Sequence, residues 1–128
     1  MATLAFREGL MDQIRLRESR FHEHAFLFVL EALEYLQQRL VERRHVDGRE
    51  LAHAVRELAI ERFGVLSGLV FDYWGVHATA DLGDIVFALV DTGLLMSQPN
   101  DSRLDFVDVY DFDDAFGDSY PWSAAHLV

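Results

Sequence analysis

Histidine and carboxylate side chains are the residues of this chain that could perform acid–base or metal chemistry. His22, Glu23 and His24 stand together, and His45 follows Arg44. Two histidines at i and i+2 point to different sides of a helix, so His22 and His24 are not expected to chelate one ion. Zinc sites on helices need histidines at i and i+4 with a third ligand, and this chain lacks that pattern. We therefore predict a polar cluster at the start of a helix and no metal-ligating residue.

An acidic segment near the end of the chain is the second candidate. Its seven carboxylates are Asp101, Asp105, Asp108, Asp111, Asp113, Asp114 and Asp118. A calcium loop counted from Asp111 fails, because Ala115 stands at the fifth position and Phe116 at the sixth, where the motif needs an oxygen ligand and a glycine. The sequence leaves weak Mg²⁺ or Ca²⁺ binding open and names no cofactor.

Covalent catalysis has little support in the sequence. Leu66-Ser67-Gly68 resembles part of a nucleophile elbow, but Val65 and Leu69 stand where that motif requires glycine. The chain has no cysteine, which excludes a cysteine nucleophile, thiolate zinc sites and iron–sulfur ligation. Its glycines stand singly, so a phosphate-binding loop is not predicted. We predict a protein that is not an enzyme, with no catalytic, cofactor-binding or metal-binding residue.

Length and composition indicate one core. The chain has 128 residues, of which 51% are apolar, enough for one domain without a disulfide or metal. Residues 1–10 lack the basic start and long apolar run of a signal peptide. The longest apolar stretches are far shorter than the roughly 20 residues that span a bilayer. A cytoplasmic protein that does not enter the membrane is the expectation.

The net charge of −11 is distributed unevenly along the chain. Residues 1–64 hold ten Arg against eleven acidic residues, which gives −1. Residues 65–128 hold Arg103 against eleven Asp, which gives −10. The acidic half should repel polyanions and could attract a basic partner. Plain solubility explains the same charge, and both interpretations stay open.

Apolar periodicity predicts five helices. Their approximate ranges are 3–17, 22–41, 47–63, 65–74 and 79–92. Asp47 and Glu50 have the spacing of a capping box at the start of the third helix, and Gly64 fits its end. Thr79 is expected to cap the fifth helix.

The fourth helix is expected to turn Leu66, Leu69, Val70 and Trp74 toward the core. Phe87, on the fifth helix, is predicted to be buried as well. Both assignments follow from apolar residues recurring at helical spacing, since such aromatic residues are usually core residues.

The fold expected from these elements is mainly α, with five helices followed by a β-hairpin. Residues 94–97 and 104–110 flank the turn sequence 99–102, which favours a hairpin. We predict a single domain over residues 1–116 and an acidic and aromatic tail over 117–128. Helices followed by a hairpin give residues 47–112 the element order of a winged helix, an order that unrelated proteins share.

Nucleic-acid binding is not expected, despite this element order. The presumed recognition helix, residues 80–92, carries Asp81, Asp84 and Asp91 and no basic residue, whereas duplex affinity comes largely from neutralised phosphates. The preferred function is a non-enzymatic, acidic protein-interaction module with an unidentified protein partner, and a basic protein is one such partner. The alternative is a winged-helix-like regulator that contacts nucleic acid through N-terminal arginines. The broad apolar surface predicted for residues 22–41 makes a homodimer a further expectation.

Several stretches of the chain also carry a family resemblance. They are residues 25–33, 44–51, 74–76, 84–87, 101–103 and 108–112. In these stretches the chain resembles a family of small proteins from planctomycete and verrucomicrobial bacteria that has no assigned activity. The resemblance implies a bacterial, cytoplasmic protein and transfers no site residue.

Overall fold

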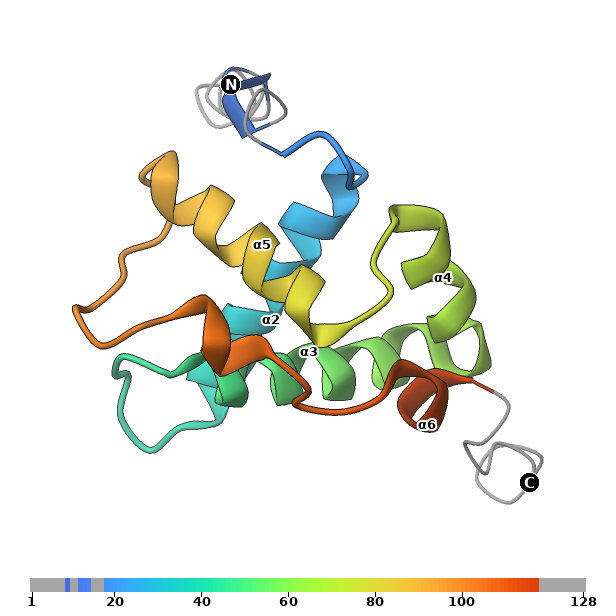
Figure 1. The fold of residues 1–128 in the computed structure, drawn as a ribbon. Helices are drawn as coiled ribbons and strands as arrows, with labels where there is room; N and C mark the ends of the chain where they lie inside the picture. Colours follow the sequence, from blue (N-terminus) through green and yellow to red (C-terminus); the bar gives the residue numbers. More distant parts are fainter. Residues whose placement is uncertain (1–8, 10–11, 15–17, 118–128) are drawn as a thin grey trace.

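The computed structural model describes residues 9, 12–14 and 18–117. About two thirds of these residues are helical. The elements are α2 (Glu23–Arg39), α3 (Gly48–Phe63), the 3₁₀ turn η1 (Gly64–Leu66), α4 (Ser67–Trp74), α5 (Thr79–Asp91), the 3₁₀ turn η2 (Arg103–Phe106) and α6 (Phe112–Phe116) (Figure 1). The predicted first helix lies mostly outside the described residues, although Gly9 and residues 12–14 are helical and Ile14 is fully buried.

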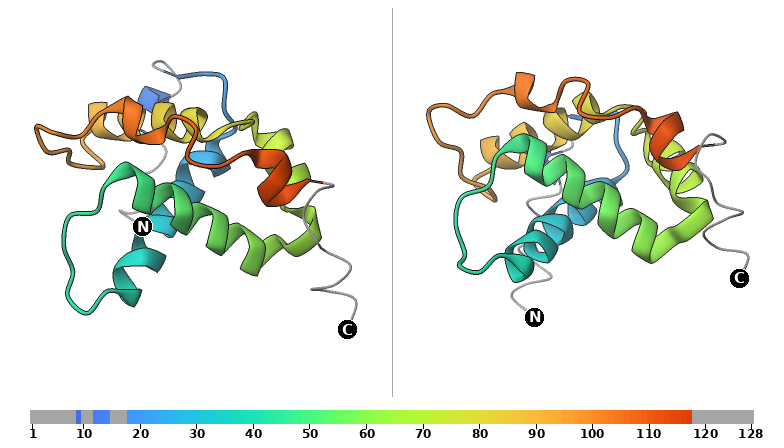
Figure 2. Two further views of the ribbon diagram at one scale, coloured as in Figure 1. Left: turned by 60° about the horizontal axis from the view of Figure 1, so that its bottom comes forward. Right: turned by 90° about the horizontal axis from the view of Figure 1, so that it is seen from below.

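The helices pack around one core. α2 packs against α3 and α5, and α4 packs beside the second half of α3 (Figure 1). The segment after α5 then returns across α5 and α3, and α6 closes it against α4 (Figure 2). Elements from both halves of the chain therefore share the same interior.

Aromatic rings fill the interior between α2 and α4. Phe28 lies 5.5 Å from Trp74 and 6.0 Å from Phe71, measured between ring centroids. Phe63 lies 5.8 Å from Trp74 in an edge-to-face arrangement, the favoured geometry of an aromatic pair. Trp74 is 8% exposed, so its predicted burial is confirmed, whereas Phe87 is only partly buried.

The boundaries of α3 are those that the sequence predicts. The Asp47 carboxylate accepts a 2.8 Å hydrogen bond from the Glu50 amide, and the Glu50 carboxylate accepts one of 3.1 Å from the Asp47 amide. Two amides that the first helical turn leaves unpaired are thereby satisfied. At the other end Gly64 has φ 55° and ψ −129°, a conformation essentially confined to glycine. The capping box and the glycine stop are both confirmed.

The orientation of α4 differs from the expected one. Ser67, Phe71 and Trp74 face the core, while Leu66 and Leu69 are 56% and 68% exposed. The Ser67 hydroxyl donates to backbone carbonyl oxygens at the end of α3 and the start of η1, so this buried polar group is satisfied. With Phe71 and Trp74 on the same face, that side of the helix buries large rings. The predicted inward positions of Leu66 and Leu69 are wrong.

Thr79 has a role other than the expected cap of α5. The N-cap position is Ala78, and the Asp81 carboxylate accepts hydrogen bonds from the amides of His77 and Ala78. Thr79 is buried at the first helical position, and its hydroxyl donates to the Phe106 carbonyl at 2.6 Å. Thr79 therefore holds the segment that follows α5, at Phe106 and Val109, against this helix and does not cap the helix.

The predicted β-hairpin is wrong, because the structure has no strand between residues 94 and 117. Residues 98–101 do form a turn, but η2 follows it, begun by a capping box between Ser102 and Asp105. The amide of Val109 donates to the Thr79 hydroxyl instead of to a partner strand. Without strands there is no wing, so the winged-helix interpretation of residues 47–112 is wrong as well. After Asp111 the chain forms the short helix α6, and residues 118–128 of the predicted tail lie outside the described residues.

Candidate functional site

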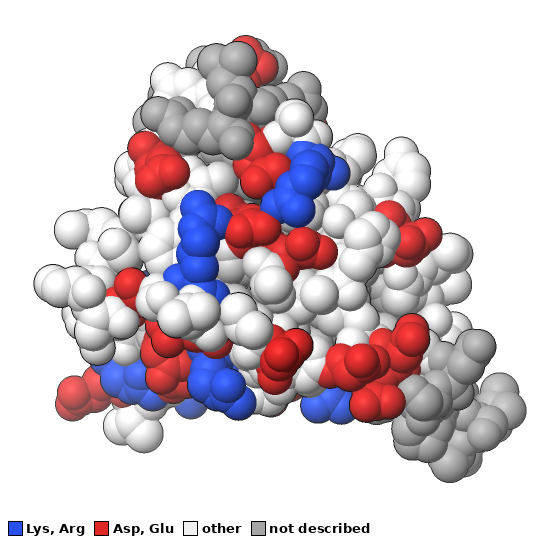
Figure 3. Space-filling view, viewed as in Figure 1, with Lys and Arg blue, Asp and Glu red and all other residues white. Residues whose placement is uncertain are grey.

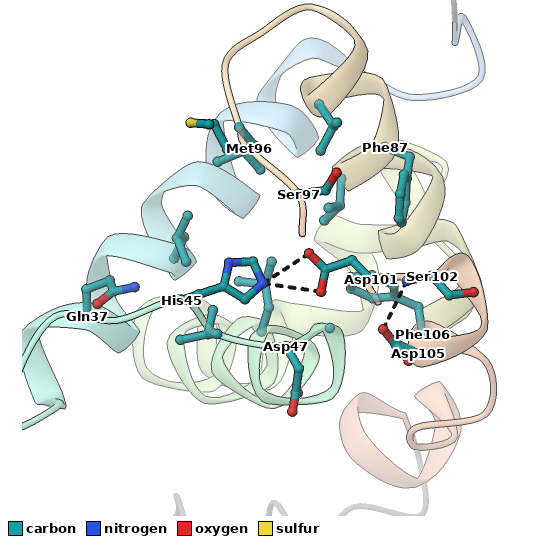
Figure 4. Close-up of a pocket in the computed structure, with 17 residues that line it drawn as sticks. Gln37, His45, Asp47, Phe87, Met96, Ser97, Asp101, Ser102, Asp105 and Phe106 are labelled. Atoms are coloured by element: carbon teal, nitrogen blue, oxygen red, sulfur yellow. Dashed lines mark hydrogen bonds and ion pairs between the residues drawn. The ribbon is translucent and has the colours of Figure 1, made fainter. Parts of the chain in front are cut away.

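A pocket lies between the helices and the loop that follows α5 (Figure 4). Its volume is about 160 Å³. The apolar part of its wall consists of Leu33, Val46, Leu51, Val86, Phe87, Val90, Leu95, Met96 and Phe106. These residues come from α2, α3, α5 and η2, and from the segments between α2 and α3 and between α5 and η2. The pocket therefore exists only once all of these parts have packed together.

His45 and Asp101 face each other at this pocket. The His45 Nε2 atom lies 3.0 Å from one carboxylate oxygen of Asp101 and 3.2 Å from the other (Figure 4). The two residues are 56 positions apart in the sequence. The sequence places His45 beside Arg44, and no local spacing connects it to Asp101.

The loops that carry this pair are held by further hydrogen bonds. The Gln37 side chain donates to the carbonyl oxygen of Arg44 at 2.5 Å and accepts from its amide at 3.2 Å. The Asp101 carboxylate also accepts from the Gln98 amide at 2.6 Å, which closes the loop around residues 98–101. Both sides of the pocket mouth thus have a fixed backbone.

Arg44 adds an ion pair on the outer side of the same loop. Its guanidinium donates to both oxygens of Glu50, at 2.7 and 3.2 Å. Hydrogen bonding by Arg44 and by the Asp47 amide lowers the pKa of the Glu50 carboxyl below its ordinary value. Glu50 therefore stays charged while it completes the capping box of α3.

A second candidate site is an exposed apolar face on α4 and η1, which we call the α4 face. It consists of Val65, Leu66, Leu69 and Tyr73, exposed by 56%, 56%, 68% and 76%. Leu66, Leu69 and Tyr73 stand at i, i+3 and i+7, so they form one ridge. Four neighbouring large apolar residues this exposed are more than scattered surface residues, and such clusters mark interaction sites.

A groove beside the α4 face has an acidic border. Gly68 and Leu69 of α4 line it together with Phe112 and Phe116 of α6. Asp72 and Asp113 also belong to its lining. In Figure 3 this side of the molecule, over α4 and α6, shows mostly uncharged and acidic surface. The acidic aspartates around α6 are thus placed next to exposed apolar side chains.

Ion pairs lie on α5, the presumed recognition helix of the winged-helix interpretation. Asp84 lies between two arginines, 2.5 Å from Arg20 and 2.6 Å from Arg103. Arg20 also pairs with Glu18, and their hydrogen bond lowers the pKa of the Glu18 carboxyl. These arginines therefore offset part of the negative charge of the α5 carboxylates.

Arginines of the helical N-terminal half are paired in the same way. The pairs are Arg39 with Glu61, Arg43 with Glu34, Arg44 with Glu50 and Arg62 with Glu31. With the wing absent and these arginines paired, the described residues give no support to a regulator that contacts nucleic acid through them. Arg15 and Arg17, which belong to the same N-terminal basic group, lie outside the described residues.

The histidine cluster at the start of α2 caps this helix. His22 is the N-cap of α2, and its Nδ1 atom accepts a hydrogen bond from the His24 amide at 3.1 Å. Its ring also lies 5.5 Å from that of Tyr73, at the edge of the α4 face. Within residues 9, 12–14 and 18–117, no three histidine or acidic side chains come together in a group that could hold a metal ion. None of the helices described is both long and apolar enough to cross a bilayer.

Comparison of the chain with protein-family models, with curated proteins and with solved structures finds no match. The resemblance to a planctomycete and verrucomicrobial family therefore stays a prediction.

Proposed function

We propose that this protein is a non-enzymatic interaction module that binds a basic, amphipathic helix of a partner protein on its α4 face. The observation that carries the proposal is the exposed ridge formed by Leu66, Leu69 and Tyr73. Helical partners commonly place an apolar stripe of their own against such a surface, with anchors at i, i+3 or i+4, and i+7.

The basic character of the partner follows from the charges around the ridge. Asp72 lies on α4 itself with its side chain 72% exposed, and Asp113 lines the adjoining groove. Residues 65–128 carry a net charge of −10. A partner helix with arginine or lysine beside its apolar stripe would be attracted and oriented by this field, while an acidic helix would be repelled.

The setting that we propose for this interaction is the cytoplasm of a bacterium, as the family resemblance implies. A second copy of this chain is the other occupant to consider. The α2 surface first expected to self-associate is at least partly covered, since Leu27, Leu30 and Leu36 are not exposed. We therefore propose the α4 face as the contact of any homodimer.

Isothermal titration calorimetry with a synthetic amphipathic helical peptide tests the partner chemistry. We expect a peptide with a lysine-rich polar face to bind, with an affinity that falls as sodium chloride is raised. A peptide with the same apolar stripe and a glutamate-rich polar face is the matched control, and we expect it not to bind. Equal binding of both peptides would contradict the acidic recognition.

Two leucine variants test the surface. Leu69→Ser should weaken peptide binding at least tenfold, because it removes an exposed anchor without opening the core. Leu104→Ser is the matched control, since Leu104 is 77% exposed on η2, away from the α4 face. Unchanged binding by Leu69→Ser would reject this site. Light scattering on the same proteins distinguishes a homodimer from the 14.7 kDa monomer.

A further inference from the structure

The pocket beside His45 and Asp101 has the size of a small-molecule site. At about 160 Å³ it is as large as engineered protein cavities of about 150 Å³ that admit benzene. The Phe87 ring from α5 lies at its wall (Figure 4). This ring is only partly buried, whereas Leu82, Ile85 and Leu89 of the same helix are buried. An apolar molecule in the pocket would cover more of this ring.

One end of the pocket is strongly polar. Asp47, Asp101 and Asp105 belong to its lining together with His45, while no arginine or lysine of the described chain does. The carboxylates of Asp47 and Asp105 accept hydrogen bonds from the amides of Glu50 and Ser102. Asp101 is the most suitable of the three to meet a ligand, because its side chain is 17% exposed and faces His45 at the mouth. A carboxylate offers about four lone-pair positions. His45 and the Gln98 amide use only part of that capacity.

We propose that this pocket binds a small primary ammonium ion with a compact hydrocarbon body. The ammonium group is held at Asp101, and the hydrocarbon body lies among Leu51, Phe87 and Val90. A carboxylate ligand is disfavoured, because the Asp101 carboxylate would repel it and no arginine or lysine of the described chain lines the pocket. This site is separate from the α4 face, so the proposal is independent of the interaction function.

Three probes of one shape test the chemistry. Benzylamine, benzyl alcohol and benzoate share an aromatic ring and differ in the charge of the attached group. We expect benzylamine to bind with a dissociation constant of about 1 mM or tighter, benzyl alcohol to bind more weakly and benzoate not to bind. Binding is followed by nitrogen–proton correlation spectra, in which the amides of Leu51, Phe87 and Val90 should shift and that of Leu69 should not.

Two variants locate the ammonium group and the ring. Asp101→Asn should weaken benzylamine binding about tenfold or more and change benzyl alcohol binding little, because a hydrogen bond to a charged group is lost. Asp108→Asn is the matched control, since Asp108 is an exposed aspartate that does not line the pocket, and it should bind benzylamine as the wild type does. Val90→Phe should abolish binding of all probes by filling the pocket.

Selective binding of benzylamine that is lost in Asp101→Asn and in Val90→Phe supports the proposal. Equal affinity for the amine and the alcohol overturns the ammonium specificity, and unchanged binding by Val90→Phe overturns the pocket as the site. If Asp101→Asn lowers the melting temperature, the comparison rests on Val90→Phe and on the probe series with the wild-type protein. Absence of benzylamine binding to the wild-type protein up to 10 mM, that is roughly ten times the expected constant, also rejects the proposal.

Discussion

The ring of Phe106 lies so close to Gly48 that a Cβ atom on Gly48 would stand 2.7 Å from Cε2 of the ring. Gly83 of α5 borders the same side chain, and a Cβ atom there would stand 3.0 Å from it. Phe106 is 3% exposed and therefore fills the junction of α3, α5 and η2. Because Gly48 and Gly83 have no side chain, Phe106 can pack this closely against α3 and α5.

Gly48→Ala is expected to destabilise the protein by about 1–3 kcal/mol, because the added methyl group forces the Phe106 ring to move. The effect is notable because alanine normally favours a helix by about 1 kcal/mol over glycine. Urea denaturation measures the change in the free energy of unfolding. Gly9→Ala is the control, since nothing lies within 4 Å of a Cβ atom at that helical position. A Gly48→Ala protein at least as stable as the wild type would contradict the tight packing.

Thr79→Val should lower the free energy of unfolding by about 2–4 kcal/mol. The substitution keeps the shape of the side chain but removes the donor to the Phe106 carbonyl and the acceptor for the Val109 amide, which lie 2.6 and 3.1 Å from the hydroxyl. Thr92→Val is the control and should cost less, because its hydroxyl donates only to carbonyls at the end of α5. Equal costs for the two variants would mean that Thr79 does not fasten the returning segment.

Trp74→Ala and Phe87→Ala are expected to differ in cost. Trp74 is surrounded by other aromatic rings, so its truncation should cost about 3–5 kcal/mol. Phe87 is only partly buried at the pocket, and we expect its truncation to cost about 1–2 kcal/mol. Thermal and urea unfolding of the two variants checks the order. A larger loss for Phe87→Ala would place that ring in the core, against its observed exposure.

Tyr110 should make stability fall at high pH. Its hydroxyl donates a 2.8 Å hydrogen bond to the Ala52 carbonyl, and burial raises the pKa of Tyr110 above the ordinary value, against a smaller opposing effect of Arg56. Above about pH 10 the unfolded chain loses this proton while the folded protein keeps it. The free energy of unfolding then falls by up to about 1.4 kcal/mol per pH unit, whereas the contribution is fully present below pH 10.

Urea denaturation at pH 8 and pH 11 measures this effect. Tyr110→Phe should remove part of the decline between the two pH values, because phenylalanine cannot ionise in either state. It should also cost about 1 kcal/mol at pH 8 through the lost hydrogen bond. Tyr73→Phe, which removes a tyrosine hydroxyl at an exposed position, is the control. The same decline in Tyr110→Phe as in the wild type would show that another group causes it.

The sequence by itself determined where α2, α3, α4 and α5 lie along the chain and how α3 begins and ends. Asp47 and Glu50 lie within one turn of each other, so the capping box of α3 is a local hydrogen-bonding problem that the sequence solves. Gly64 likewise ends α3 because few other residues adopt its backbone conformation. The charge distribution of the chain and its lack of cysteine chemistry are also properties of the sequence alone.

The tertiary structure alone decided which faces are covered and which distant residues meet. Leu66 and Leu69 have the spacing of core residues, but the burial of Phe71 and Trp74 leaves them exposed. The residues after α5 have the composition of a hairpin. In the structure, however, the Phe106 carbonyl and the Val109 amide hydrogen-bond to the Thr79 hydroxyl, 27 and 30 positions away in the sequence, and not to a partner strand. His45 and Asp101 meet across a pocket for the same reason: contacts between residues far apart in sequence follow from the packing of whole helices, which local spacing does not encode.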